Sequence, residues 1–290
     1  MKQSDKVQCI AETLPYIQSF RHKRFIFKVG GHMQVYPGVF STFLEDLVLL
    51  SEMGMQIILV HGGGKEISSR LEALGLEARF VEGQRVTCPE TMTEVEMVLT
   101  GKVNTSIVQE LNKLGASAVG LNGKDGKMIE AKKRVASSVN GSDLGLVGEV
   151  TQVNTGVLDQ MIRGGFIPVV SPVAFSREGE TLNVNADMVA AAIARATQAE
   201  KLILMSDVDG LFDDFSQKDS LITKASLEEI RQMVDHKRVT AGMLPKLQGI
   251  IESLESGVAS VHIINGLVEH AVLLEVFTQE GIGTMITKEG

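Results

Sequence analysis

Four short runs of mostly apolar residues, each followed by glycine or a polar residue, constrain the fold of this chain more than any other feature. They span 57–60, 167–170, 202–205 and 261–264. Strands that are apolar on both faces are typical of a parallel sheet buried between helices. The sequence therefore predicts a largely parallel sheet that is covered on both sides.

Between these runs, apolar residues recur at the spacing of a helix. One stripe begins at Phe43 and stops before Gly54, and another begins at Val95 and stops before Gly115. Glycine just after the last periodic residue is a common helix stop. Strands alternating with helices indicate the α/β class.

Several polar or glycine-rich motifs follow the predicted strands directly. They are Gly30-Gly31, Gly62-Gly63-Gly64, Asp207-Val208-Asp209-Gly210 and Asn265-Gly266. Ligands of open α/β sheets bind beyond the carboxyl ends of the strands. We therefore expect these motifs to share one ligand-facing edge.

Two lysines point to the ligand's chemistry. Lys28 ends a predicted strand beside Gly30 and Gly31, and Lys246 follows a short turn containing Pro245. Glycine leaves backbone N–H groups open to an anion, and lysine adds a compact positive charge. If the fold brings the two lysines together, they form a site that handles phosphate.

Three polar residues at alternate positions, Asn183, Asn185 and Asp187, precede an alanine-rich helical segment. Helix capping accounts for only one of these residues. In an extended segment, alternate residues face the same side, so all three would then form part of one site. Asp207 and Asp209 have three possible interpretations: carboxylates of a surface loop, neighbours of a bound cation, or neighbours of a lysine. His61 is interpreted as a hydrogen-bonded turn residue, because the six histidines show no metal-ligand spacing.

Composition excludes several classes of protein. The net charge of −8 argues against nucleic acid and an anionic membrane surface as partners, and 4% aromatic residues without tryptophan argue against base stacking. No apolar run reaches 18 residues, and the two cysteines, Cys9 and Cys88, favour a reducing cytoplasm. The segment 62–65 fails as a P-loop, because Leu59 stands where the first glycine belongs.

Six motifs in order resemble the amino acid kinase family, over about Leu14 to Ile286. They are Lys28-Val29-Gly30-Gly31, Val60-His61-Gly62-Gly63-Gly64, Glu82-Gly83-Gln84-Arg85-Val86-Thr87, Leu182-Asn183-Val184-Asn185-Ala186-Asp187, Ser206-Asp207-Val208-Asp209-Gly210 and Gly242-Met243-Leu244-Pro245-Lys246. The resemblance implies a three-layer α/β/α sandwich with a mainly parallel sheet. It also implies transfer of the γ-phosphoryl group of ATP, with Mg²⁺ carried by the nucleotide, onto a carboxylate to form an acyl phosphate.

Within the family, the resemblance implies N-acetyl-L-glutamate as acceptor, in arginine biosynthesis. A longer acid such as acetylaminoadipate, or carbamate, stays open as an alternative. A non-catalytic amino-acid sensor on the same fold is a further alternative, although such a sensor could discard Lys28, Asp187 and Lys246.

The resemblance also implies a role for each matched residue. Lys28 and Lys246 would stabilise the migrating phosphoryl group, and Asp187 would orient both lysines. The residues implied to bind the acceptor are Gly63, Gly64, Arg85, Asn183 and Asn185. The residues implied to bind ATP or its phosphates are Gly30, Gly31, Asp207, Gly210, Phe212 and Met243. No residue is expected to ligate a metal directly. Two departures from the family pattern are His32 and Val29, and 213–218 aligns poorly.

The two ends of the chain resemble an arginine-sensitive branch of the family. There, N-terminal helices interlace dimers into hexamers, and arginine binds near the helix and the C-terminal segment. The implied effector residues are Tyr16, Glu275, Gly281 and Gly283; a capping helix and an edge strand are the plainer interpretation. We expect an oligomerisation helix at 1–24, an acceptor-binding lobe at 25–180 and a nucleotide-binding lobe with the effector segment at 181–290.

Overall fold

A computed structural model describes residues 3–81, 83–134, 143–213, 217–236 and 243–289. Glu82 and Gly242 of the predicted motifs lie outside these ranges, as does part of the poorly aligned segment 213–218. The largest sheet has eight strands in the order β14-β16-β15-β11-β1-β2-β8-β5. In chain order they are β1 (Arg24–Val29), β2 (Gln56–His61), β5 (Ala118–Asn122), β8 (Ile167–Ser171), β11 (Lys201–Ser206), β14 (Lys224–Ser226), β15 (Ser260–Asn265) and β16 (Thr284–Thr287).

Neighbouring strands of this sheet run parallel, except that β15 and β16 are antiparallel. The four predicted runs form β2, β8, β11 and β15, so the predicted parallel sheet is confirmed. Strand β1 lies between β2 and β11, with Phe25 opposite Ile57 on one side and Lys201 on the other. The chain builds the sheet outward from β1 in both directions, and ligands of α/β sheets bind at such a switch point.

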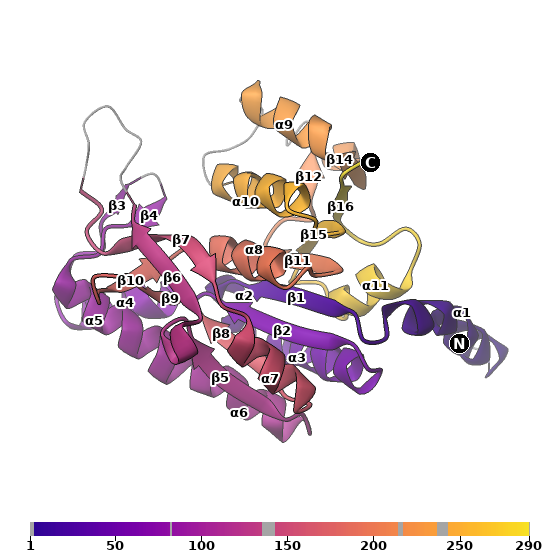
Figure 1. Cartoon of the computed structure of the whole chain (residues 1–290). Helices are drawn as coiled ribbons and strands as arrows, with labels where there is room; N and C mark the ends of the chain where they lie inside the picture. The colour runs from indigo at the N-terminus through magenta and orange to yellow at the C-terminus, as the bar shows by residue number, and fades with distance from the viewer. Residues whose placement is uncertain (1–2, 82, 135–142, 214–216, 237–242, 290) are drawn as a thin grey trace.

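Helices cover both faces of the sheet, which confirms the three-layer architecture (Figure 1). One face carries α7 (Gly156–Arg163), α8 (Ala186–Ala196), α9 (Leu227–Asp235) and α10 (Leu244–Glu255). The other carries α2 (Gly31–Gln34), α3 (Pro37–Glu52), α4 (Gly64–Ala73), α5 (Pro89–Glu96), η1 (Met97–Asn104), α6 (Thr105–Lys113) and α11 (Ala271–Phe277).

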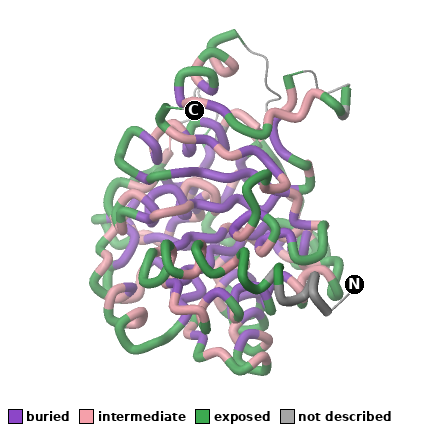
Figure 2. Tube along the Cα trace, turned by 90° about the vertical axis from the view of Figure 1, so that its right-hand side faces the viewer, coloured by how far each residue is buried: buried purple, intermediate pink, exposed green. Residues whose placement is uncertain are grey.

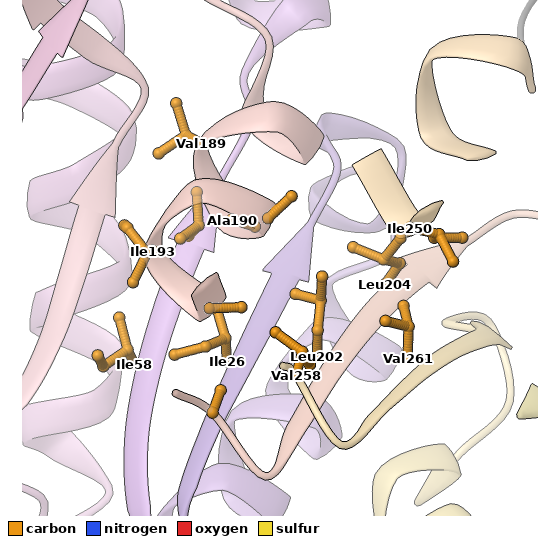
Figure 3. Packing of buried hydrophobic residues seen from close by; sticks show 14 of the residues in the cluster. Ile26, Ile58, Val189, Ala190, Ile193, Leu202, Leu204, Ile250, Val258 and Val261 are labelled. Atoms are coloured by element: carbon orange, nitrogen blue, oxygen red, sulfur yellow. The ribbon is translucent and has the colours of Figure 1, made fainter. Parts of the chain in front are cut away.

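The alternation of side chains along β1 separates two hydrophobic cores. Ile26 points into the core beneath α8 and α10, with Leu202 and Val261 (Figure 3), whereas Phe25 and Phe27 point into the opposite core. Successive strand residues face opposite sides, so a strand with no polar residue in its centre must be covered twice. Figure 2 shows the buried strands in the middle of the molecule and exposed residues along the outer helices.

The predicted helical stripes are helices, but one contains an irregularity that spacing did not reveal. The stripe from Phe43 lies in α3, and Gly54 follows it at φ +90°, a conformation that favours glycine. The stripe from Val95 runs through α5, η1 and α6, of which η1 is a π-helix. A π-helical turn is wider than an α-turn, and such segments are frequent at functional sites.

A small four-stranded barrel lies beside the carboxyl edge of the sheet, in the order β10-β7-β6-β9. Strands β6 and β7 of this barrel pair antiparallel, and 135–142 between them lie outside the described residues. The remaining short elements are β3 (Phe80–Val81), β4 (Gln84–Arg85), η2 (Asp125–Lys127), β6 (Ile129–Lys133), β7 (Val147–Val153), β9 (Val173–Phe175), β10 (Thr181–Val184), β12 (Leu211–Phe212), η3 (Lys218–Ser220) and β13 (Leu221–Ile222).

Helix α1 (Gln3–Phe20) projects from one side of the molecule next to α11 (Figure 1). Aromatic contacts attach its second half to the body: Tyr16 meets Phe277 edge-on at 6.4 Å, and Phe20 meets Phe25 at 5.4 Å. Further toward the N-terminus, apolar side chains are exposed, Ile10 by 73% and Leu14 by 52%. None of the helices described is both long and apolar enough to cross a membrane.

Candidate active site

A single carboxylate oxygen joins the two lysines that the sequence singled out. Lys28 Nζ lies 3.0 Å from Asp187 Oδ1, and Lys246 Nζ lies 3.1 Å from the same atom. Lys28 comes from the end of β1, Asp187 from the first turn of α8 and Lys246 from the first turn of α10. The three side chains are 10–15% exposed, so the triad is largely shielded but open to a ligand.

The electrostatics of the triad favour its charged form. Burial alone would raise the pKa of Asp187, but the ammonium groups of Lys246 and Lys28 hold it well below its usual range. Burial lowers the pKa of Lys246, and Asp187 opposes that change. Two cations sharing one anion leave a net positive charge, so the triad attracts an anionic ligand.

The two predicted glycine motifs lie next to each other at this edge. Gly62 N–H donates to Val29 O over 2.8 Å, which ties the second motif to the end of β1. Gly63 packs closely, because a Cβ there would lie 2.7 Å from Leu99 Cδ2 in η1, so that Leu99 would have to move. Gly64 differs, since a Cβ would meet nothing within 4 Å, and it begins α4.

A cleft of about 240 Å³ opens beside the triad. Lys28 and Asp187 lie at its wall, together with both glycine motifs and the segment 183–186. Predicted residues that line it are Lys28, Gly30, Gly31, Gly63, Gly64, Arg85, Asn183, Asn185 and Asp187, and unpredicted ones include Ile67, Phe80, Gln84, Leu99 and Pro172. Residues far apart in the sequence thus form one continuous surface.

Arg85 is held firmly but incompletely partnered. Its Nη2 donates to Gly64 O over 3.0 Å and to Ser68 Oγ over 2.7 Å, and its guanidinium lies 4.7 Å from the centre of the Phe80 ring. Nη1 is buried and has no hydrogen-bond partner among the residues that the structure describes. Burial lowers the pKa of Arg85, although a guanidinium stays protonated at neutral pH. A planar carboxylate entering the cleft is a suitable acceptor.

The three alternate polar residues divide between capping and the cleft. Asn185 is the N-cap of α8, and its Oδ1 accepts from the backbone N–H of Asp187 over 2.8 Å and of Met188 over 3.3 Å. Asn183 Nδ2 donates to Thr87 Oγ1 over 3.2 Å. A single extended segment is the wrong interpretation, because β10 ends at Val184 and Asp187 is helical. The cap still brings all three to one cleft.

His61 and Asn104 form a chain of hydrogen bonds that ends at Gly62 of the glycine motif. His61 is buried, and desolvation lowers its pKa to about 4, so the ring is neutral at physiological pH. Its Nδ1 lies 2.9 Å from Gly62 O and donates to it, which leaves Nε2 to accept from Asn104 Nδ2 at 3.1 Å. The hydrogen bonding predicted for His61 is confirmed, although His61 ends strand β2. Asn104 was not predicted, since its position depends on the register of η1.

The other predicted nucleotide-side residues lie outside this cleft's lining. Asp207 is exposed just after β11, and its charge opposes part of the lowering that burial causes in the pKa of Lys246. Gly210 packs closely, because a Cβ there would lie 2.5 Å from Thr284 Oγ1. Phe212 is partly buried in β12, and Met243 is the N-cap of α10, three residues before Lys246. Their proposed contacts with ATP therefore remain a prediction.

The predicted effector residues lie in the region between α1 and the C-terminal segment. Glu275 is buried, accepts from Ile282 N–H over 2.8 Å and lies 2.5 Å from His262 Nδ1 through its other oxygen. Gly281 has φ +63°, and a Cβ there would lie 2.7 Å from Glu275 Oε2. Close packing explains Gly283, where a Cβ would lie 2.1 Å from Ile263 O.

Two further titratable side chains, the partly buried Lys201 and the buried His262, lie in the same place. Lys201 Nζ lies 3.0 Å from His262 Nε2 and 5.3 Å from the centre of the Phe20 ring. Burial would raise the pKa of Glu275, but the bond to His262 and the nearby Lys201 hold it below its usual range. Lys201 and His262 were not predicted, because each stands within a mostly apolar strand.

Comparisons with known proteins identify the family. The model of the amino acid kinase family matches residues 23–265. The chain belongs to the amino acid kinase family. It is 47% identical to the acetylglutamate kinase of Methanocaldococcus jannaschii over 98% of this chain and 97% of that one. It is 46% identical to the acetylglutamate kinase of Caldanaerobacter subterraneus subsp. tengcongensis over 98% and 94%.

A solved structure of N-acetylglutamate synthase from Neisseria gonorrhoeae, complexed with coenzyme A and N-acetyl-glutamate, has the same fold. Its TM-score is 0.84 at 26% identity, covering 98% of this chain and 64% of that one. These likenesses confirm the family and fold expected from the six motifs. The prediction that the chain is an enzyme, a kinase of this family, is also confirmed.

Proposed function

We propose that this enzyme transfers the γ-phosphoryl group of ATP to the side-chain carboxylate of N-acetyl-L-glutamate, forming N-acetylglutamyl 5-phosphate in arginine biosynthesis. The observation that carries the proposal is the pair of lysines on one oxygen of Asp187. Relatives with 46–47% identity across nearly the whole chain support the choice of acceptor. A cytoplasmic location, expected from cysteine usage, belongs to the same proposal.

The geometry fits the electrostatic problem of this reaction. A carboxylate oxygen attacks the γ-phosphorus while the bond to the β-phosphate oxygen breaks, so two anions must approach each other. Lys28 and Lys246 offset that repulsion at the point of transfer, and Asp187 holds both in place. A carboxylate at neutral pH is already ionised, so the step needs no general base. Catalysis then rests on positioning and charge stabilisation.

Acceptor binding is assigned to the cleft beside the triad. The unpartnered Arg85 Nη1 would donate to the α-carboxylate, and Asn183 would contact the acylamino group. Gly63 and Gly64 would hold the attacked carboxylate, and Asn185 keeps its role as helix cap near the substrate. A longer acid differs by one methylene, which is worth only about 1–3 kcal/mol in binding.

The nucleotide would lie across the strand ends of β11, near Gly30, Gly31, Asp207, Gly210, Phe212 and Met243. Within the described residues, no three His, Cys, Asp or Glu side chains cluster so as to hold a metal ion. Mg²⁺ would be carried by the nucleotide, because Mg²⁺ takes few carboxylates together with substrate phosphates. When bound, it would neutralise part of the phosphate charge.

Turnover with hydroxylamine tests the proposal directly. The acyl phosphate is trapped as a hydroxamate, and we expect product with ATP and N-acetylglutamate. Comparing kcat/KM for N-acetylglutamate, acetylaminoadipate and carbamate identifies the acceptor. Absence of hydroxamate with every acid, together with intact folding, would contradict the proposal and favour a non-catalytic sensor.

We also propose regulation by arginine at the region between α1 and the C-terminal segment. Glu275 supplies a buried carboxylate for a guanidinium, and Tyr16, Gly281 and Gly283 lie in the surrounding elements. The Glu275 carboxylate already makes hydrogen bonds with His262 Nδ1 and the backbone N–H of Ile282, so arginine binding would require this segment to rearrange. We expect arginine to inhibit wild-type turnover and Glu275→Gln to respond less, with activity retained when arginine is absent.

A homo-oligomer completes the proposal, either a dimer or a hexamer built as a trimer of dimers. The exposed Ile10 and Leu14 on the projecting α1 support contact with a second copy. The division into 1–24, 25–180 and 181–290 remains a prediction.

A further inference from the structure

His32 departs from the expected family pattern and lies beside the lysine triad. It follows the Gly30-Gly31 turn and belongs to α2, a single helical turn of four residues. A Cβ placed on Gly30 would lie 2.6 Å from His32 Nδ1 and 3.6 Å from Lys28 Nζ. The imidazole and the Lys28 ammonium therefore border the same point of the glycine turn.

The ring carries a polar atom without a partner. His32 Nε2 is buried and makes no hydrogen bond within the described part of the chain. A buried donor or acceptor without a partner is unfavourable, so such an atom beside a ligand site indicates that the ligand completes its hydrogen bonding. Burial lowers the His32 pKa; of the surrounding charges, Asp207 raises it, and Lys28 and Lys246 lower it.

The position of α2 decides which substrate the ring faces. Met33, the next residue, packs on Gly266 after β15, where a Cβ would lie 2.3 Å from the Met33 sulfur. The Ser206 backbone at the end of β11 also contacts His32 and raises its pKa. His32 is not among the residues that line the acceptor cleft. The ring thus lies on the side of β11 and β15, where the proposed function places the nucleotide.

We propose that His32 binds a phosphate oxygen at the β- or γ-position of the nucleotide through the Nε2–H of its imidazolium form, which the phosphate charge stabilises, as a positioning residue for phosphoryl transfer. This inference rests on the proposed function, since it assumes that the strand ends of β11 hold ATP. A phosphate oxygen accepts the imidazole proton and supplies the missing partner, while Lys28 neutralises charge on the adjacent side. Hydrogen bonds to charged groups contribute about 1.5–3 kcal/mol, which corresponds to roughly 10- to 150-fold in affinity.

Binding of nucleotides of different length separates this contact from a structural role. Isothermal titration calorimetry with AMP, ADP and the Mg²⁺ complex of AMP-PNP is compared for wild type, His32→Leu and His32→Gln. We expect His32→Leu to weaken ADP or AMP-PNP binding about tenfold or more while AMP binding stays within twofold. Glutamine places an N–H close to the position of Nε2, so His32→Gln should recover much of the loss. Val35→Ala, an exposed residue just after α2, is the matched control.

Kinetics give an independent result. His32→Leu should raise KM for ATP while KM for N-acetylglutamate changes less than twofold. Equal affinity of wild type and His32→Leu for all three nucleotides, or an equal loss for AMP and AMP-PNP, would overturn the inference. Failure of the proposed function is distinguishable, because in that case the wild-type protein itself forms no hydroxamate.

Discussion

At the scale of single residues, charge concentrated on one atom governs the site. Asp187 Oδ1 holds two ammonium groups within 3.1 Å, so each lysine is positioned before any substrate arrives. Preorganised charge needs no rearrangement during the reaction, which is why it lowers a barrier effectively. Removing one cation leaves the other and its carboxylate paired, so folding should survive while catalysis fails.

Lys28→Ala and Lys246→Ala should each lower kcat by about 10²–10³, the usual cost of one preorganised charge donor. Lys65→Ala, an exposed lysine on the first turn of α4, is the control and should keep wild-type activity. Hydroxamate formation measures the effect, and circular dichroism checks folding. Near-normal turnover of Lys28→Ala or Lys246→Ala would remove that lysine from the mechanism.

Two adjacent glycines offer a matched pair of substitutions. Gly63→Ala places a methyl group 2.7 Å from Leu99, and overpacking of this kind costs about 1–3 kcal/mol. Gly64→Ala meets open space and begins a helix, so its unfolding free energy should stay near that of wild type. Chemical denaturation compares the two. Equal stability of both variants would show that Leu99 gives way easily.

At the scale of elements, much of the site was predictable, because strand ends of a parallel sheet converge. Lys28 and the glycine motifs could be placed at one edge from the apolar runs alone, and Lys246 and Asp187 through the family's motifs. The position of Asn104 could not be predicted, because the π-helical register of η1 is set by tertiary packing. The partial pairing of Arg85 also depends on contacts between β4 and α4, which sequence spacing does not encode.

An ion pair between elements gives a pH-dependent stability. Asp46, buried in α3, lies 2.7 Å from His270 Nδ1 at the start of α11, and this bond raises the pKa of His270. A histidine with a raised folded-state pKa stabilises the fold fully below its unfolded pKa of about 6.5 and loses that contribution as pH rises through the folded pKa.

His270→Ala should therefore cost more stability at pH 6 than at pH 9. Because the ring is about half exposed, the loss at pH 6 should be about 1 kcal/mol or less. Urea unfolding of both proteins at the two pH values measures it. A difference that is constant with pH, or that grows toward pH 9, would contradict this linkage.

At the scale of the whole molecule, the first half of α1 has little support from its own chain. Aromatic contacts hold Tyr16 and Phe20, while Ile10 and Leu14 stay exposed. An exposed apolar stripe on a projecting helix gains free energy when a second copy covers it.

Deletion of residues 1–20 should reduce a hexamer to dimers and blunt arginine inhibition. The double variant Ile10→Ser/Leu14→Ser should reduce the mass of the assembly in the same way, while it keeps the aromatic contacts of Tyr16 and Phe20. Light scattering and inhibition curves measure both effects. Unchanged mass and unchanged arginine response in the deletion variant would show that α1 only caps the fold.

The sequence distance between the joined lysines has a consequence for synthesis of the chain. Lys28 lies on β1, whereas Lys246 lies on α10, which follows most strands of the sheet in the sequence. A ribosome-bound chain that ends before α10 would hold Asp187 beside one cation only. Activity should therefore emerge abruptly near completion of translation, which makes turnover a reporter of finished folding.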